Sequence, residues 1–502
     1  MENKQISVLR TRREFIRQAA CAAVGTVAIS SCVRDLRFMN AAMAQSNVND
    51  YKALVCIFLA GGNDSNNLVI PTIQSEYDSY ANIRTSLLAV PLSGAPYNVL
   101  KLANDVTGNY APLNSDGHEY GLHPACPELR TLFGEGKLAL MFNTGTLVVP
   151  MTRATYTSDA LHRPPQLFSH ADQVTQWQTS IPDQPPLTGW GGRCADLLAA
   201  VQPSAPISML VTLSGANTFE VGNTASQYSV STSGAISLNG VTGSRLTTLN
   251  SLLGLPYGNL QAQAYSSIAA HSINTGTLLN NAISPTSSAT YWTVPFPGTV
   301  TVPTSGTTFG SSLGPQLKMI ARLIEAGSRS VASGGFGMKR QIFFCTVGGY
   351  DLHTGQVTVG NPVTGSHANL MAEISQCVLA FQRAMEQIGT QRGDPDFGKR
   401  VTSFTSSDFG RTFPSNGSGS DHGWGSHHLI IGGAVKGRRT YGRWPVLTVN
   451  GPDDTNTGRW IPSTACDQYF ATLATWFGLD NSNLGTVFPN LGRFSTPNLG
   501  FL

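Results

Sequence analysis

The stretch Ala53-Leu-Val-Cys-Ile-Phe-Leu59, followed at once by Ala60-Gly-Gly-Asn-Asp64, indicates the fold class of this chain. A run of seven apolar residues that ends at glycines is typical of a strand buried on both faces of a parallel sheet. Residues 138–142, 341–347 and 401–405 form similar strand-like runs. We therefore predict four buried strands.

Helical patterns lie between these runs. Residues 127–133, 317–332, 367–388 and 467–477 place apolar side chains at i, i+3 and i+4, which is the spacing of an amphipathic helix. Strands that alternate with helices predict an α/β fold with a mostly parallel sheet.

The middle of the chain differs from both ends. Between residues 197 and 317 the only charged side chains are Glu220 and Arg245, and Ser, Thr, Asn and Gly dominate around one helical stretch at 246–282. We interpret residues 45–196 and 317–502 as two parts of one α/β core, and residues 197–316 as a cap or insertion. An independent binding domain is the alternative interpretation of the middle.

Composition and charge exclude several classes of protein. The chain has 502 residues, of which 41% are hydrophobic, so it can bury a large core and is not globally disordered. A net charge of +3, from 32 basic and 29 acidic residues, leaves no polybasic surface, and we expect no nucleic-acid partner. After residue 45 no stretch is apolar enough to cross a bilayer, so we expect no transmembrane segment.

The first 44 residues have the pattern of an export signal. Arg12 and Arg13 precede Phe15 and a short apolar stretch at 19–29, as in a twin-arginine signal peptide. Ala42-Met43-Ala44 is a small-x-small cleavage site, which predicts a periplasmic or secreted protein. Lipid attachment at Cys32 is the alternative, because the residues before it resemble a lipobox. Twin-arginine export carries folded proteins, often with a metal already bound.

Three of the predicted strands end close to an aspartate: Asp64, Asp351 and Asp408. The carboxyl ends of parallel strands meet at one edge of the sheet, where ligands bind in open α/β folds. Three carboxylates brought together repel one another unless cations or arginines compensate. We therefore expect a cation site at this edge, while helix capping and pairing of Asp408 with Arg411 are the structural alternatives.

Imidazoles follow the same strands. His353 comes two residues after Asp351, and a polar, glycine-rich loop contains Asp421, His422, His427 and His428. Mixed carboxylate and imidazole ligands favour Zn, Mn or Fe over Mg or Ca, and we predict one or two divalent ions. We interpret the other candidate histidines, His118, His123 and His170, as structural hydrogen-bonding residues.

Motifs of other enzyme classes are missing from the sequence. It has no GxGxxG after a strand, no Walker loop and no HExxH motif. A broken GxSxG pattern at 417–420 lies in a loop, without the strand before it and the helix after it that a nucleophile elbow requires. A serine hydrolase is therefore not expected.

Taken together, these segments resemble the domain of unknown function 1501 family, whose members are exported bacterial proteins of the alkaline phosphatase and sulfatase superfamily. The resemblance is carried by Ser407-Asp-Phe-Gly-Arg-Thr412, Gly419-Ser-Asp-His-Gly-Trp-Gly-Ser-His-His428 and Gly432-Gly-Ala-Val-Lys-Gly437, with support from Gly348-Gly-Tyr-Asp-Leu-His353 and Phe168-Ser-His170. It implies a three-layer α/β/α sandwich and a site for two divalent metals.

The resemblance also implies a set of metal ligands. Asp64 matches the aspartate after the first strand, and Asp351 with His353 matches an aspartate with a nearby histidine. Asp408 stands where an Asp-His pair is expected, with Phe409 in place of the histidine. The resemblance then leaves Asp421, His422 and His427 or His428 to complete the set.

The superfamily's nucleophile has no clear counterpart here. Its position corresponds to Leu122-His123-Pro124, which has no hydroxyl.

The first hypothesis is an exported metal-dependent hydrolase of a phosphate or sulfate ester, with Arg411 or His123 stabilising the developing charge. The second is a non-catalytic protein that binds a glycan-like ligand or an envelope component. The third is an assembly factor for an exported partner protein.

Overall fold

The computed structural model describes residues 48, 50–185, 187–202, 204–236, 238, 240–288 and 290–502. The export signal predicted over residues 1–44, with its cleavage site and Cys32, lies outside these residues.

A mixed sheet runs through the centre of the molecule in the order β14-β5-β13-β12-β1-β11-β6-β7-β8, and β15 pairs with β5. In that order the strands are Thr440–Tyr441, Leu138–Gly145, Ser426–Gly432, Val401–Ser407, Lys52–Leu59, Arg340–Val347, Leu210–Thr212, Tyr228–Ser231 and Gly234–Ala235, and β15 is Thr464–Ala465. β1 pairs in parallel with both β11 and β12. β13 is antiparallel to both of its neighbours, β12 and β5, so β5 runs in the same direction as β1.

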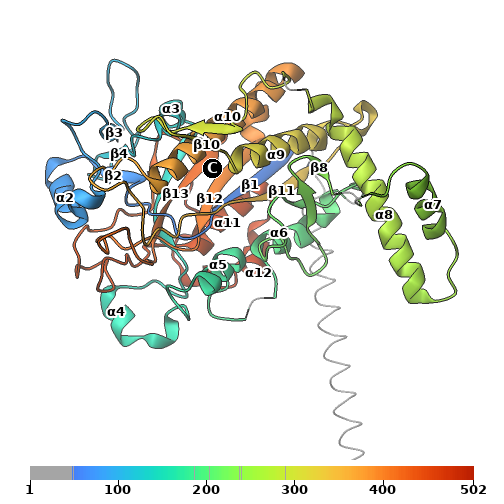
Figure 1. The fold of residues 1–502 in the computed structure, drawn as a ribbon. Helices are drawn as coiled ribbons and strands as arrows, with labels where there is room; N and C mark the ends of the chain where they lie inside the picture. Colours follow the sequence, from blue (N-terminus) through green and yellow to red (C-terminus); the bar gives the residue numbers. More distant parts are fainter. Residues whose placement is uncertain are drawn as a thin grey trace, which may run out of the picture.

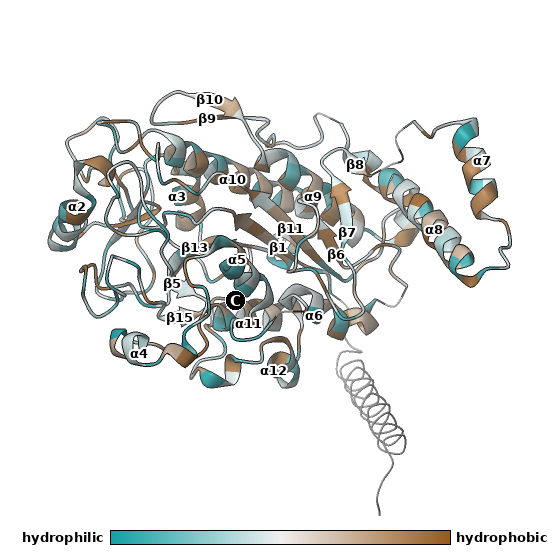
Figure 2. Cartoon of the chain, turned by 60° about the horizontal axis from the view of Figure 1, so that its bottom comes forward, coloured by the Kyte–Doolittle hydropathy of each residue, from teal (hydrophilic) through white to brown (hydrophobic). Residues whose placement is uncertain are grey.

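Alternate residues of β1 enter two hydrophobic cores, one on each face of the sheet. Val55 and Ile57 pack in a core with α3, α9 and α10, which span Pro127–Gly134, Leu313–Ser328 and Ser366–Arg392. Leu54 and Phe58 pack with α5, α6 and α11, which span His170–Thr179, Trp190–Leu198 and Cys466–Phe477. The apolar strands lie between these helices in Figures 1 and 2. The prediction of an α/β fold with a mostly parallel sheet is confirmed.

Residues 197–316 contribute both to the sheet and to an appended helix pair. β6 pairs with β11, and β7 and β8 extend the same edge of the sheet. α7 (Ser244–Leu253) and α8 (Leu260–Ile283) then form a hairpin that projects from the body of the molecule (Figure 1). β9 (Thr299–Thr301) and β10 (Thr308–Gly310) return the chain as a small hairpin against α10.

The remaining elements surround the sheet. β2 (Val69–Pro71), β3 (Leu100–Lys101) and β4 (Tyr120–Leu122) form a small separate sheet, and α2 (Gln74–Leu88) lies beside it. α4 (Arg153–Ser158) and α12 (Leu484–Val487) are short helices at the periphery. None of the helices in the described ranges has the length and apolar character that crossing a membrane requires. The six cysteines in these ranges are buried and unpaired.

The sheet topology directs four loops to one edge. β1, β5, β11 and β12 run in the same direction, so their carboxyl ends share that edge. β13 runs in the opposite direction and begins there, because Ser426 pairs with Thr144 near the end of β5. The loop from residue 408 to 425 therefore crosses the carboxyl edge, where the candidate site is found.

Candidate metal centre

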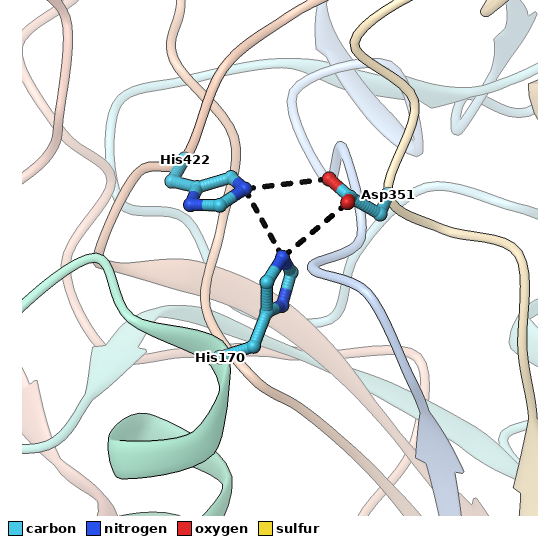
Figure 3. A group of neighbouring side chains, drawn as sticks. All are labelled: His170, Asp351 and His422. Atoms are coloured by element: carbon cyan, nitrogen blue, oxygen red, sulfur yellow. Dashed lines mark hydrogen bonds and ion pairs between the residues drawn. The ribbon is translucent and has the colours of Figure 1, made fainter.

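His170, Asp351 and His422 converge above the carboxyl edge of the sheet, with one ligand atom from each lying within 4.8 Å of the others. The Nε2 atoms of His170 and His422 are 3.0 Å apart. The carboxylate of Asp351 lies 3.5 Å from His170 Nε2 and 3.3 Å from His422 Nε2. Figure 3 shows the three side chains pointing toward one another from three separate segments.

His353 adjoins this group from the loop after β11. Its Nε2 atom is 2.9 Å from His422 Nε2 and 3.1 Å from Asp351 Oδ1. Two residues predicted as ligands, Asp351 and His422, are thus in direct contact with a third, His353. His170, interpreted from the sequence as a structural residue, lies in the same cluster.

The other ring nitrogen of each histidine is held by an oxygen. His170 Nδ1 lies 2.7 Å from Asp408 Oδ2, and His353 Nδ1 lies 2.8 Å from Asp421 Oδ1. His422 Nδ1 lies 2.7 Å from the backbone oxygen of Phe168. Asp408 and Asp421, predicted as ligands, therefore orient the rings from behind, an arrangement common around protein-bound metals.

These contacts set the protonation of the rings. A backbone carbonyl only accepts hydrogen bonds, so His422 must donate through Nδ1. Burial lowers the pKa of His422, so the ring is neutral at pH 7 and its Nε2 carries a lone pair. His170 and His353 each place Nδ1 against a carboxylate, so in the neutral tautomer that donates through Nδ1 the Nε2 lone pair faces the centre.

Two Nε2 lone pairs that face one another at 3.0 Å repel, and either a proton on one nitrogen or a metal ion bound by both removes the repulsion. Zn–N bonds of about 2.0–2.1 Å in a tetrahedral site place two nitrogen ligands roughly 3.3 Å apart, close to the separation of His170 and His422 Nε2. The donor set of imidazole nitrogens and one carboxylate also suits Zn, Mn or Fe. The residues therefore fit a divalent transition metal.

Arg411 balances the charge of Asp351. Its side chain is buried, and its Nη1 donates to Asp351 Oδ1 at 2.8 Å and to the backbone oxygen of Gly61 at 3.2 Å. Partial burial raises the pKa of Asp351, but the hydrogen bond and charge of Arg411 outweigh this effect and the pKa falls below its usual value. Asp351 is therefore ionised at neutral pH and available as a ligand.

Asp64 lies outside the cluster, in a buried ion pair. It accepts hydrogen bonds from Arg84 on α2 and from Gln356, and its exposed fraction is 2%. Burial raises the pKa of Asp64, yet the charge of Arg84 brings it below its usual value. The structure thus provides Asp64 with an arginine as its counter-ion.

His427 and His428 also lie outside the cluster, because both belong to β13 and are buried within the protein. His427 accepts a hydrogen bond from the backbone N–H of Asn143 at 3.0 Å and stacks on Trp444. His428 packs against Trp177 on the other side of the strand. Burial lowers the pKa of each ring to about 3, as expected for neutral core histidines.

His123 is likewise a core residue. Its ring is fully buried and packs edge-on against His367, with 5.9 Å between ring centroids. Its Nδ1 accepts a hydrogen bond from the backbone N–H of Ala125 at 3.1 Å. Burial lowers its pKa to about 3. The contacts of His123 are with this buried group and not with the cluster around His422.

His170 was missed because its spacing carries no motif. It is the first residue of α5 and reaches the cluster only through the long connection from the end of β5. The one available signal was the segment Phe168-Ser-His170 that contributes to the family resemblance. Phe168 has a φ of +73°, an unfavourable region for an aromatic residue, and its carbonyl there accepts the hydrogen bond from His422.

A cavity of about 520 Å³ lies beside this segment. Phe168, Arg163 and Tyr156 are among its lining residues. The loop that supplies His170 and the carbonyl for His422 thus also forms a wall of a cavity large enough for an organic molecule.

Comparison with known proteins identifies the family. No curated protein matches the chain. The family model described as "Protein of unknown function (DUF1501)" matches residues 51–478. Since this match spans most of the 502 residues, the chain belongs to the DUF1501 family.

Proposed function

We propose that this chain is a metal-dependent hydrolase of phosphate or sulfate esters, exported through the twin-arginine pathway. The observation that carries the proposal is the convergence of His170, Asp351 and His422, with His353 beside them. A divalent Zn, Mn or Fe ion bound there would supply Lewis-acid polarisation of an ester oxygen and would lower the pKa of water.

Exposure of the cluster favours catalysis over a purely structural role. Structural zinc sites are closed by four protein ligands, whereas catalytic sites keep a position open. The side chains of Asp351 and His353 are 45% and 41% exposed, so a ligand can reach them from solvent. The cavity beside Phe168 offers room for the organic part of an ester.

The residues of the cluster and their hydrogen-bond partners have distinct parts in this proposal. His170, His422 and Asp351 would hold the ion, and His353 would complete its coordination or contact the ester. Asp408, Asp421 and the Phe168 carbonyl keep the ring protons on Nδ1. Arg411 is fixed by Asp351 and two backbone oxygens, those of Gly61 and Ser420, so it positions Asp351. The proposal gives His123 no part, because its ring is buried against His367.

The proposal includes an alkaline phosphatase-like or sulfatase-like architecture. Support comes from the mostly parallel sheet with helices on both faces, and from a cluster built on loops at the carboxyl ends of its strands. The twin-arginine pattern at Arg12 and Arg13 supports export.

Metal content and ester turnover test the proposal on the same samples. Protein purified without chelators should contain one or two equivalents of Zn, Mn or Fe by inductively coupled plasma mass spectrometry. His422→Ala and Asp351→Asn should lose the metal and the turnover of aryl phosphate or aryl sulfate esters. His162→Ala removes an exposed histidine outside the cluster and should retain both. Wild-type metal content in His422→Ala would disprove the site.

A second candidate is a non-catalytic protein that binds a glycan-like or envelope ligand. The α7–α8 hairpin favours an apolar envelope ligand, because it lines an open, mostly apolar pocket of about 420 Å³ whose lining includes Leu246, Leu253 and Tyr265. A metal-loaded protein that turns over neither ester class but is retained on an envelope fraction would support this candidate over the hydrolase.

A further inference from the structure

Arg459 lies on a hydrogen-bonded loop next to the cluster of His170, Asp351 and His422. The carboxylate of Asp454, which has no exposed surface, accepts the backbone N–H of Arg459 at 2.9 Å and that of Gly458 at 2.8 Å. Residues 454 and 460 also pair as an isolated bridge. The loop therefore presents the Arg459 side chain from a fixed backbone position.

Two contacts orient the guanidinium of Arg459, and both involve the cluster. Its Nε donates to the backbone oxygen of His422 at 2.8 Å. Its Cζ lies 4.2 Å from the centroid of the Phe168 ring. Phe168 is the residue whose carbonyl accepts the hydrogen bond from His422 Nδ1. The guanidinium therefore contacts both His422, a candidate ligand, and Phe168, which orients the His422 ring.

The two terminal nitrogens of Arg459 make no hydrogen bond or ion pair within the described part of the chain, and neither is buried. Other ordered arginines use theirs: Arg193 donates through Nη1 and Nη2 to backbone oxygens, and Arg340 does so to Asp50 and to backbone oxygens. Arg459 is thus held by Nε and by its flat face, and its fork of N–H donors is free for a ligand.

We infer that Arg459 binds the anionic oxygens of the substrate beside the metal. A planar guanidinium with two free nitrogens matches the paired oxygens of a phosphate or sulfate group. Holding the side chain in place before the ligand arrives reduces the entropy lost on binding. This inference rests on the proposed function and specifies how the anionic group of the ester is recognised.

Inorganic phosphate is the probe that tests it. Isothermal titration calorimetry on the metal-loaded protein should show phosphate binding, with metal content measured on each sample. Arg459→Gln should raise the Kd for phosphate about tenfold or more, the loss expected for a charge-assisted hydrogen-bond pair. The Kd of Arg459→Lys should lie between those of the wild type and Arg459→Gln, since an ammonium keeps the charge but cannot donate two parallel hydrogen bonds. Arg245→Gln, on α7, removes an exposed arginine far from the cluster and should have no effect.

Each other outcome has a defined meaning. Wild-type phosphate affinity in Arg459→Gln overturns the inference, as does a metal-loaded wild type that binds no phosphate. A fall in metal content in Arg459→Gln also overturns it, because Arg459 then acts through His422. Phosphate binding that depends on Arg459, in a protein that hydrolyses no ester, upholds the inference and refutes the proposed hydrolase.

Discussion

Asp421 and Asp408 each hold one histidine ring of the candidate metal site from behind. Asp421 Oδ1 accepts from His353 Nδ1 and from Asn416 Nδ2, each at 2.8 Å. Asp408 accepts from His170 through Oδ2 and from the backbone N–H of Gly61 through Oδ1. Each carboxylate therefore fixes one imidazole ring and makes its Nε2 more basic.

Asp421→Asn should weaken metal binding without abolishing it. The amide oxygen can still accept from His353 Nδ1, but the negative charge that strengthens the ring as a ligand is lost. We expect the metal Kd to rise about 10–100-fold, measured by competition with a chelator of known affinity. Asp396→Asn, which changes an exposed aspartate paired with Lys399, is the control. Equal affinities in the two variants would show that Asp421 does not orient the ring.

Residue patterns predicted some members of the cluster and not others. Asp351, His353 and His422 were predicted as ligands and lie together. Asp64 does not join them, because Arg84, twenty residues later on α2, folds back onto it. Spacing along the chain does not show which basic side chain or metal ion will pair with a given carboxylate. It also does not distinguish a histidine in a loop from His427 or His428 inside a strand.

At the scale of elements, the loops after β1 and β11 pack closely against each other. A Cβ atom on Gly61 would lie 2.3 Å from the backbone nitrogen of Asp351 and 2.9 Å from the carbonyl carbon of Tyr350. Gly61 also donates to Asp408 and accepts from Arg411. A single glycine therefore sets the distance between the end of β1 and the loop that carries Asp351.

Gly61→Ala should displace Asp351 and lower metal affinity at least about tenfold, since ligand positions must be kept within about 0.5 Å. Gly349→Ala is the matched control: Gly349 is in the loop that carries Asp351 and also has a positive φ, +95° against +116° for Gly61, but its nearest neighbour to a Cβ is Leu370 Cδ2 at 3.8 Å. Both variants strain the backbone, and only Gly61→Ala adds the clash. Chelator competition compares their metal affinities, and equal losses would refute the steric explanation.

The elements predicted from apolar periodicity are present. The four runs correspond to β1, β5, β11 and β12, and the four helical patterns correspond to α3, α9, α10 and α11. β13 was missed because its first residues, Ser426, His427 and His428, are polar. The helical stretch predicted at 246–282 is divided into α7 and α8, which the segment Gly254-Leu-Pro256 separates.

At the scale of the whole molecule, four histidines are buried in the core with uncharged rings. Burial lowers the pKa of His123, His427 and His428 to about 3 and that of His367 to about 4, from an ordinary value of 6.5. Below pH 6.5 the unfolded chain takes up protons at these rings and the folded chain does not. These histidines therefore stabilise the fold above pH 6.5, and this contribution is lost as the pH falls toward 4.

Two buried acids act in the opposite direction. Burial raises the pKa of Glu220 to about 8 and that of Asp467 to about 7. Between about pH 4.5 and 7 the folded chain keeps these protons, while the unfolded chain has released them. Their contribution to stability is therefore present at low pH and is lost as the pH rises through this range.

Because four histidines oppose two acids, stability should rise with pH from about 4.5 to 6.5 and decline above it, as the histidine contribution ends and that of the acids continues to fall. Urea unfolding of metal-free protein across pH 5–8 measures this, and a maximum near pH 6.5 is expected.

His428→Phe should reduce the slope of unfolding free energy against pH, between pH 5 and 6, by up to about 1.4 kcal/mol per pH unit, the value for one proton. Tyr469→Phe alters the ring stacked on His428 without removing a group that titrates in this range, so its slope should equal that of the wild type. An unchanged slope in His428→Phe would show that this histidine is protonated alike in the folded and unfolded chains.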